Sequence, residues 1–143
     1  MFISVILPVY NSEQFLEQAI KSIWGQKFLD WELIAINDGS TDTSLKILEK
    51  YKEQDKLCRI KIIDLKSNKG LGYARNKGIS IAKGKFLFFL DSDDFIEENC
   101  FSILSKKLKK KFISLVTMVV IQRESCYLKL YQKKERRRIL KVI

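Results

Sequence analysis

The apolar run Phe86–Leu90 ends abruptly in three carboxylates, at Asp91, Asp93 and Asp94. An unbroken apolar run of this length is typical of a strand that is buried on both faces inside a parallel sheet. Open α/β sheets bind their ligands just outside the carboxyl ends of the strands. Because three like charges this close repel one another, the cluster predicts a positively charged partner. A divalent metal that carries a phosphate ligand is the natural candidate.

The rest of the chain alternates between strand patterns and helix patterns. Strands are predicted at 3–9, 31–37, 60–64 and 85–90, helices up to about 24 and over about 42–54, 70–82 and 97–110, and the apolar run 113–121 is compatible with a fifth strand. This alternation indicates βαβ units and a mostly parallel sheet flanked by helices, which is an α/β fold. Right-handed crossovers then bring three polar clusters, at 8–11, 37–40 and 91–94, to one rim of the sheet.

Two local signals refine the first strand and the first helix. Pro8 cannot donate a hydrogen bond to a neighbouring strand, so it marks either the end of its strand or a strand at the sheet edge. Asn11 and Ser12 are good N-cap residues and predict a first helix that begins directly after them.

Asp91 and Asp93 are the strongest candidates for metal ligands. In an extended backbone, residues i and i+2 project to the same side. Two carboxylates so placed bind Mg²⁺ or Mn²⁺ and leave coordination positions for phosphate oxygens. The simpler interpretation is that Asp93 or Asp94 caps the helix that follows. The position of the acids after a buried strand, on a rim with other polar loops, favours the metal.

Two further residues are candidates for ligand contacts at the same rim. Asp38 ends the second strand, so its carboxylate is expected to point into the crevice and to accept a hydrogen bond from a nucleobase N–H. The alternative is an Asx turn, in which Asp38 bonds its own backbone two residues on. Arg75 follows a predicted helix N-terminus, which attracts phosphate. It is either a planar fork for an anion or a surface arginine.

Composition limits the chemistry of this 143-residue chain, which is long enough for one domain with a sizeable core. There is no histidine, which excludes a histidine base, metal ligand or triad. Cys58, Cys100 and Cys126 are too scattered for a disulfide framework, so we expect a reducing, cytoplasmic setting. The apolar N-terminus has no basic residues and is too short for a signal peptide or a membrane span. The first turn lacks the glycines of a nicotinamide dehydrogenase or a nucleotidylyltransferase.

The positive charge of the chain lies at its C-terminal end. Residues 1–103 contain 14 Lys and Arg against 15 Asp and Glu, whereas residues 104–143 contain 13 against 2. We therefore expect a domain over 1–110 and a basic segment over 111–143 that forms an extra strand and helix or is disordered. The basic segment is a patch for anionic lipid or nucleic acid, a solvated helix, or sequence from a truncated gene or an altered reading frame.

Four short motifs occur in order between residues 3 and 100. They are Pro8-Val9-Tyr10-Asn11, Asn37-Asp38-Gly39-Ser40-Thr41-Asp42, the pattern N-x-G-x-x-x-A-R-N-x-G at 68–78 and the pattern G-x-(apolar)-L-D-x-D-D at 84–94. Together they resemble the family 2 glycosyltransferases, enzymes of the GT-A fold that use nucleotide-sugar donors. The resemblance implies a Rossmann-like, mostly parallel sheet flanked by helices, of which this chain forms the N-terminal nucleotide-sugar-binding half, truncated after the DxD region.

The resemblance also implies a role for the matched residues. Asp38 binds a uracil-type base in a pocket shaped by Pro8 and Tyr10, and Arg75 lies near the nucleotide. The donor-binding set is Pro8, Tyr10, Asn11, Asp38, Arg75, Asp91 and Ser92, and the metal ligands are Asp93 and Asp91, for Mn²⁺ or Mg²⁺.

The reaction implied by the resemblance is transfer of a sugar from a nucleotide-diphosphate donor, expected to be a UDP-sugar, to a glycan or lipid-linked acceptor in cell-surface polysaccharide synthesis. In this family the deprotonating carboxylate lies well after the DxD motif, and only 50 residues follow Asp93. The remaining acids, Glu97, Glu98, Glu124 and Glu135, lack the expected context, so we assign no catalytic residue.

Two other interpretations stay open. The chain is a catalytically incomplete nucleotide-sugar-binding remnant of a truncated or frameshifted gene, or it is an adaptor whose basic segment docks on the anionic inner face of the membrane. The partners that we expect are a donor, an acceptor and a membrane surface, with self-association or a partner subunit, and no nucleic acid. Exposed apolar surface favours such association.

Overall fold

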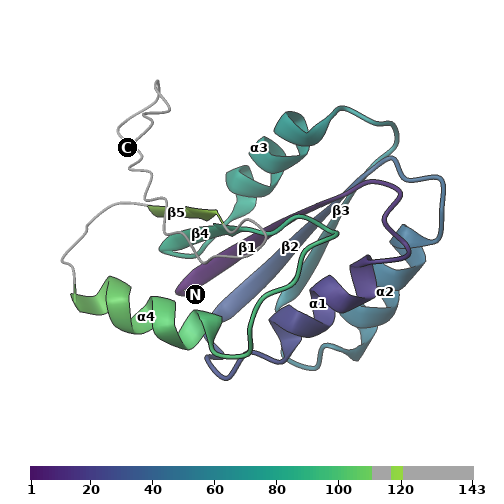
Figure 1. Ribbon diagram of the computed structural model, residues 1–143. Coiled ribbons are helices and arrows are strands. Elements are labelled where there is room, and N and C mark those ends of the chain that lie inside the picture. The colour runs from purple at the N-terminus through teal and green to yellow at the C-terminus, as the bar shows by residue number, and fades with distance from the viewer. Residues whose placement is uncertain (111–116, 121–143) are drawn as a thin grey trace.

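A sheet of parallel strands forms the centre of the computed structural model, which describes residues 1–110 and 117–120 (Figure 1). Within these residues the strands are β1 (Ile3–Val9), β2 (Trp31–Asp38), β3 (Ile60–Leu65), β4 (Phe86–Phe89) and β5 (Thr117–Val120). Their order across the sheet is β3-β2-β1-β4-β5, and each neighbouring pair is parallel. The predicted α/β fold is confirmed, and β5 lies inside the apolar run that was compatible with a strand.

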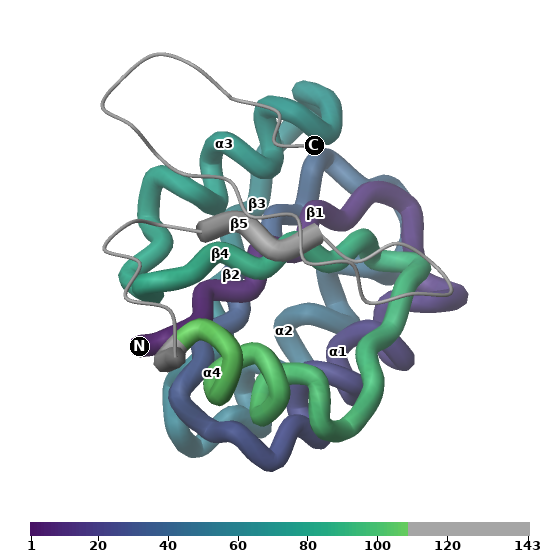
Figure 2. Tube along the Cα trace, turned by 60° about the vertical axis from the view of Figure 1, so that its left-hand side comes forward, coloured from purple at the N-terminus to yellow at the C-terminus, as the bar shows by residue number. Residues whose placement is uncertain are grey.

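Helices cover both faces of the sheet. They are α1 (Leu16–Trp24), α2 (Ser44–Gln54), α3 (Leu71–Ile81) and α4 (Cys100–Lys110). Figure 1 and Figure 2 show α3 on one face and the other three helices on the opposite face. Since successive side chains of a strand point to opposite faces, Val5 and Leu7 pack with α1 and α4, whereas Ile6 packs with α3.

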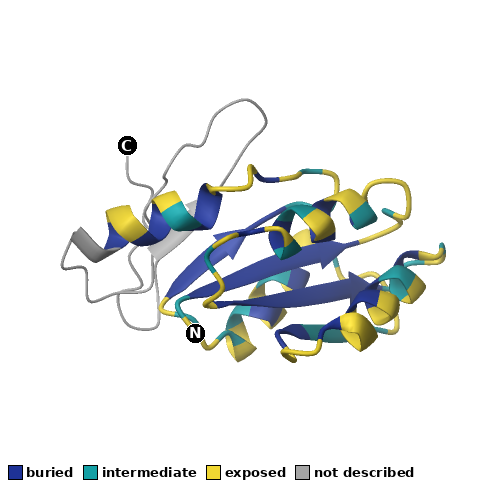
Figure 3. Cartoon of the chain, turned by 90° about the horizontal axis from the view of Figure 1, so that it is seen from below, coloured by how far each residue is buried: buried dark blue, intermediate teal, exposed yellow. Residues whose placement is uncertain are grey.

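Burial on both faces explains the unbroken apolar pattern of the strands. Every residue of β1, β2 and β4 is buried, whereas β3 is mostly half-buried. In Figure 3 the buried strands are dark blue between helices whose outer sides are yellow. Gly78 allows α3 to lie close to the sheet, because a Cβ there would be 2.8 Å from side-chain atoms of both Ile6 and Ile36. The glycine that ends the third motif is therefore explained by packing.

Pro8 lies in the central strand, so the expectation of a sheet edge is wrong. The expectation of a strand end is right. The Ile6 carbonyl accepts a hydrogen bond from the Leu90 N–H at 3.1 Å, and Pro8 faces the same neighbour because it lies two residues further on. The pairing of β1 with β4 stops at Ile6 and Phe89, so the missing N–H of Pro8 meets no partner strand.

The helices begin later than the sequence predicts. The Ser12 carbonyl accepts hydrogen bonds from the N–H groups of Phe15 and Leu16, and α1 starts only at Leu16. Asn11 and Ser12 are therefore not N-caps of this helix. Helix α4 starts at Cys100, which rules out capping of this helix by the Asp93 or Asp94 side chain. The boundary predicted near residue 110 stays a prediction, because most of the basic segment lies outside the described residues.

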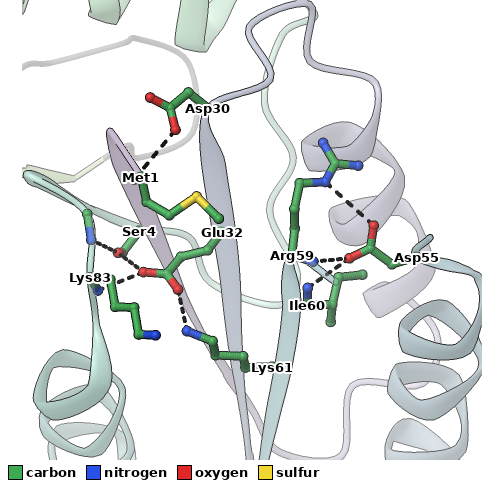
Figure 4. Close-up of polar contacts among 10 residues, drawn as sticks. Met1, Ser4, Asp30, Glu32, Asp55, Arg59, Ile60, Lys61 and Lys83 are labelled. Atoms are coloured by element: carbon green, nitrogen blue, oxygen red, sulfur yellow. Dashed lines mark hydrogen bonds and ion pairs between the residues drawn. The ribbon is translucent and has the colours of Figure 1, made fainter. Parts of the chain in front are cut away.

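A buried carboxylate connects the amino ends of the strands, opposite the polar rim (Figure 4). Glu32 is 1% exposed. Its carboxylate accepts hydrogen bonds from Ser4 Oγ at 2.6 Å and the Lys83 N–H at 2.7 Å, and it pairs with Lys61 Nζ at 2.6 Å. Ser4 Oγ in turn accepts the Gly84 N–H. Because an unpaired buried charge is costly, these contacts make Glu32 a stabilising cross-link between β1, β2, β3 and the residues before β4.

We expect Glu32→Ala to lower the free energy of unfolding by about 3 kcal/mol, because it leaves buried donors without an acceptor and Lys61 without its counter-ion. Urea unfolding followed by circular dichroism measures the change. Glu53→Ala removes an exposed carboxylate from α2 and is expected to change stability by less than about 0.5 kcal/mol. Equal effects of the two substitutions would contradict the assignment.

The same residue predicts a pH dependence of stability. Burial by itself raises the pKa of Glu32, but hydrogen bonds from Lys61, Ser4 and Lys83 outweigh it and bring the pKa below its usual value of 4.5. A lowered pKa in the folded state contributes stability above the usual value, and this contribution disappears as the pH falls through the lowered one. The stability advantage of the unaltered chain over Glu32→Gln should therefore be constant above about pH 5.5 and shrink below about pH 4.5. An advantage that persists unchanged to about pH 3 would refute this expectation.

Candidate functional site

A pocket of about 260 Å³ opens at the carboxyl ends of β1, β2 and β4, beside the N-terminus of α3. It is lined by Pro8, Val9, Tyr10, Asp38, Asn68, Gly70, Leu71, Ala74, Asp91, Ser92 and Asp93. The strand order reverses between β1 and β4, because β2 and β3 follow on one side of β1 and β5 lies on the other. Ligands of open α/β sheets bind at such a reversal, outside the carboxyl ends of the strands.

The structure brings most of the predicted site residues together at this pocket. Pro8, Tyr10, Asp38, Asp91, Ser92 and Asp93 line it, whereas Asn11 and Arg75 do not. Val9 and Leu71 also line the pocket, and they occupy variable positions of the first and third motifs. Asn68, Gly70 and Ala74 belong to the third motif, and that motif was the signal that could have placed them in the site.

Asp38 holds the loop that follows β3. It is 3% exposed, and its two carboxylate oxygens accept hydrogen bonds from the N–H groups of Lys69, at 2.7 Å, and Gly70, at 2.8 Å. The Asp38 carboxylate thus binds a loop that is distant in the sequence. In the predicted alternative, an Asx turn, it would bind its own backbone two residues on. Because each carboxylate oxygen has two lone pairs, Asp38 keeps the capacity to accept a further hydrogen bond from a ligand.

Gly39 allows this loop to approach the end of β2. Its φ of +69° lies in the left-handed region, and a Cβ there would be 2.6 Å from the backbone nitrogen of Asn68. A larger residue would be both strained and in collision with the loop. The Asp-Gly pair of the second motif therefore sets one wall of the pocket, with the aspartate binding the loop and the glycine making space for it.

The carboxylates after β4 lie in a turn. The Asp94 N–H donates a hydrogen bond to the Asp91 carbonyl at 3.1 Å, which closes a four-residue turn over 91–94. The expectation of an extended backbone at Asp91 and Asp93 is therefore wrong, and so is the geometric reason that placed their side chains on one side. Both residues nevertheless line the pocket, because the turn starts directly at its edge.

Arg75 supplies positive charge to the acidic turn. Its Nη2 atom lies 2.7 Å from Oδ1 of Asp91, and this pair links α3 to the turn. The two side chains are 33% and 46% exposed, so water screens the pair and its contribution to stability is modest. Arg75 was predicted to pair with an anion, and in the structure that anion is the Asp91 carboxylate. The pair orients Asp91 at the pocket wall.

The acidic turn fits a divalent metal that is held together with a substrate. Among residues 1–110 and 117–120, no group of three or more His, Cys, Asp or Glu side chains is placed to hold a metal ion. Mg²⁺ in nucleotide sites is characteristically bound through one or two carboxylates together with phosphate oxygens, without an all-protein cage. Asp91 and Asp93 provide two carboxylates on the pocket wall, which is the donor set that such an ion needs.

The described part of the chain contains no helix that is both long enough and apolar enough to cross a membrane.

Comparison with known proteins identifies relatives over most of the chain. EpsJ of Bacillus subtilis (strain 168), named an uncharacterized glycosyltransferase, is 38% identical over 114 residues, which are 80% of this chain and 32% of EpsJ. The poly(ribitol-phosphate) beta-glucosyltransferase of Bacillus spizizenii (strain ATCC 23059 / NRRL B-14472 / W23) is 42% identical over 99 residues, which are 67% of this chain and 15% of that enzyme. The chain spans about a third of the length of several curated relatives.

A solved structure has the same fold. The crystal structure of S. aureus TarS 1–349 in complex with UDP matches with a TM-score of 0.72 and 34% identity, over 77% of this chain and 32% of that one. The family model described as "Glycosyl transferase family 2" matches residues 4–141, which include all four motifs and every residue that lines the pocket. The chain therefore belongs to glycosyl transferase family 2 and has the GT-A fold.

Proposed function

We propose that this chain carries the donor-binding site of a glycosyltransferase that transfers a sugar from a UDP-sugar to a glycan or lipid-linked acceptor in cell-surface polysaccharide synthesis. The observation that carries the proposal is the pocket itself, because three polar loops far apart in the sequence meet there at the strand reversal. The family membership and the relative that is named for a polymer acceptor support it. So does TarS, whose structure contains UDP.

In this proposal the base binds at the β2 side of the pocket. Asp38 accepts a hydrogen bond from the base N–H while its carboxylate also holds Lys69 and Gly70. Pro8 and Tyr10 form the adjoining wall. A carboxylate that is already held by two backbone donors has little freedom to move, so a base contact costs little further ordering.

The diphosphate binds at the β4 side, near the acidic turn. A Mn²⁺ or Mg²⁺ ion held by Asp93 and Asp91 would neutralise the negative charge that grows on the diphosphate leaving group. Arg75 keeps the Asp91 carboxylate oriented through their 2.7 Å contact. Arg75 does not line the pocket, so its proposed role near the nucleotide is exerted through Asp91.

A second candidate function is donor binding without sugar transfer. In the part of the chain that the structure describes, the carboxylates on the pocket wall are Asp38, Asp91 and Asp93, and the proposal uses all three for the donor and the metal. A base for the acceptor hydroxyl is therefore left unassigned. Incubation of the chain with UDP-sugars and candidate acceptors, with detection of released UDP, decides between the two functions.

We also propose a cytoplasmic setting in which the basic segment 111–143 contacts the inner face of the membrane. The support is the sequence alone, since residues 104–143 contain 13 Lys and Arg and 2 Asp and Glu. Anionic lipids attract such segments.

Calorimetric titration with UDP and Mn²⁺ tests the donor site. We expect binding by the unaltered chain and about tenfold or greater loss of affinity in Asp93→Ala, because the ion loses a carboxylate ligand. Asp94→Ala is the matched control, since Asp94 lies in the same turn but outside the pocket wall, and its affinity should stay within about twofold of the unaltered chain. Absence of UDP binding, or equal losses in both variants, would reject the proposal.

Asp38→Asn tests the base contact. An asparagine keeps the shape but turns one acceptor into a donor, which suits cytosine N3 better than the N3–H of uracil. We expect the affinity for UDP to fall about tenfold and the ratio of UDP to CDP affinity to fall with it. Faster amide exchange at Lys69 and Gly70 would report the separate loss of loop contacts. An unchanged UDP to CDP ratio would show that Asp38 shapes the loop without reading the base.

A further inference from the structure

Two loops at the rim are joined by hydrogen bonds that run in both directions. They are the β1–α1 loop, residues 10–15, and the β2–α2 loop, residues 39–43. We propose that Asn11 and Glu13 are positioning residues that lock these loops together, so that Tyr10 and Asp38 face one pocket. This inference rests on the proposed donor site and assigns a function to two side chains that do not line it.

Asn11 makes the first half of the lock. Its Oδ1 atom accepts hydrogen bonds from the Thr41 N–H at 2.8 Å and from Thr41 Oγ1 at 3.3 Å. The Asn11 N–H donates in return to Ser40 Oγ at 3.0 Å. Asn11 has a φ of +46°, a left-handed conformation that asparagine tolerates better than most residues. Its backbone and side chain therefore both engage the β2–α2 loop.

Glu13 makes the second half. One carboxylate oxygen, Oε2, accepts hydrogen bonds from the Thr43 N–H at 3.0 Å and from Thr43 Oγ1 at 2.7 Å. The Glu13 N–H donates to Asp42 Oδ2 at 3.0 Å, and Asp42 Oδ1 accepts the Ser44 N–H. Hydrogen bonds to an ionised acceptor are the stronger ones, so this exchange between Glu13 and residues 42–43 is the firmer part of the lock.

Ser12, between the two positioning residues, connects the lock to the third loop of the pocket. Its N–H donates to Ser44 Oγ at 2.9 Å, and its Oγ atom lies 2.6 Å from Ser92 Oγ in the acidic turn. The β1–α1 loop is therefore tied to both of the other rim segments. Displacement of this loop would move the walls of the pocket relative to one another.

The lock begins where the backbone pairing stops. The hydrogen-bonded pairing of β1 with β2 ends at Val9 and Asn37, and Tyr10 and Asp38 are the residues that follow directly. Beyond this point, the side-chain and backbone contacts of the lock hold the β1–α1 loop against the β2–α2 loop. Asn11 and Glu13 are exposed and do not belong to the hydrophobic core. Their contacts therefore act by fixing the positions of the two loops relative to each other.

Titration with UDP and Mn²⁺ tests the role of the lock. We expect Asn11→Ala and Glu13→Ala each to weaken UDP binding by about tenfold. Asn11→Asp and Glu13→Gln keep an oxygen acceptor for the threonines, so they are expected to stay within about threefold of the unaltered chain. If the conservative variants bind UDP normally and the alanine variants do not, the hydrogen-bond acceptor of each side chain is what matters for UDP binding.

Tyr51→Phe is the matched control for stability. It removes the 2.7 Å hydrogen bond from Tyr51 to Glu17 between α2 and α1, away from the rim loops, and leaves the lock intact. We expect it to lower the melting temperature without changing UDP affinity. If its UDP affinity falls as far as that of the alanine variants, a general loss of stability explains the effect and the inference is overturned.

Amide hydrogen exchange gives a measurement that needs no ligand. The Thr41 and Thr43 amides should be protected in the unaltered chain, and each should exchange at least about tenfold faster in the alanine variant of its acceptor. If the unaltered chain protects these amides but does not bind UDP, the proposed function fails and the positioning role fails with it. If UDP binding survives both alanine substitutions while protection is lost, the positioning role alone is overturned.

Discussion

Burial of the central strand β1 on both faces is the constraint from which the architecture follows. A strand with helices on both sides has no polar face, and its neighbours must pair with it on both edges. The chain meets this requirement by placing β2 and β3 on one edge of β1 and β4 on the other, with α3 on the opposite face from α1 and α2. The reversal of strand order follows from this arrangement, and it brings the ends of β1 and β4 to the pocket.

At each end of the sheet, a buried carboxylate joins segments that are distant in the sequence, but the two carboxylates bind different groups. At the amino ends, the buried carboxylate of Glu32 joins neighbouring strands through Ser4 and Lys61. At the carboxyl ends, Asp38 binds backbone amides of the loop before α3. The first acid stabilises the fold in a place that no ligand needs to reach. The second lies on the pocket wall, so its hydrogen bonds support the loop and leave capacity for a ligand.

The strands and most helices were predictable because their patterns are local. The run of apolar residues in β1, β2 and β4 reports burial directly, and the four motifs indicate the family and the rim. The start of α1 was not predictable in this way. Asn11 and Ser12 are good capping residues, but in the structure their side chains bind residues of other loops. The competing long-range contacts override the local propensity.

The sequence by itself determined the order of elements, the α/β class and which residue types meet at the rim, because periodicity and turn chemistry act over a few neighbouring residues. Only the tertiary structure decided that Arg75 pairs with Asp91, that Asp38 holds Lys69 and Gly70, and that 91–94 is a turn. These contacts join residues from different loops, and their geometry depends on how the helices pack on the sheet. A linear pattern contains the partners but not the distances between them.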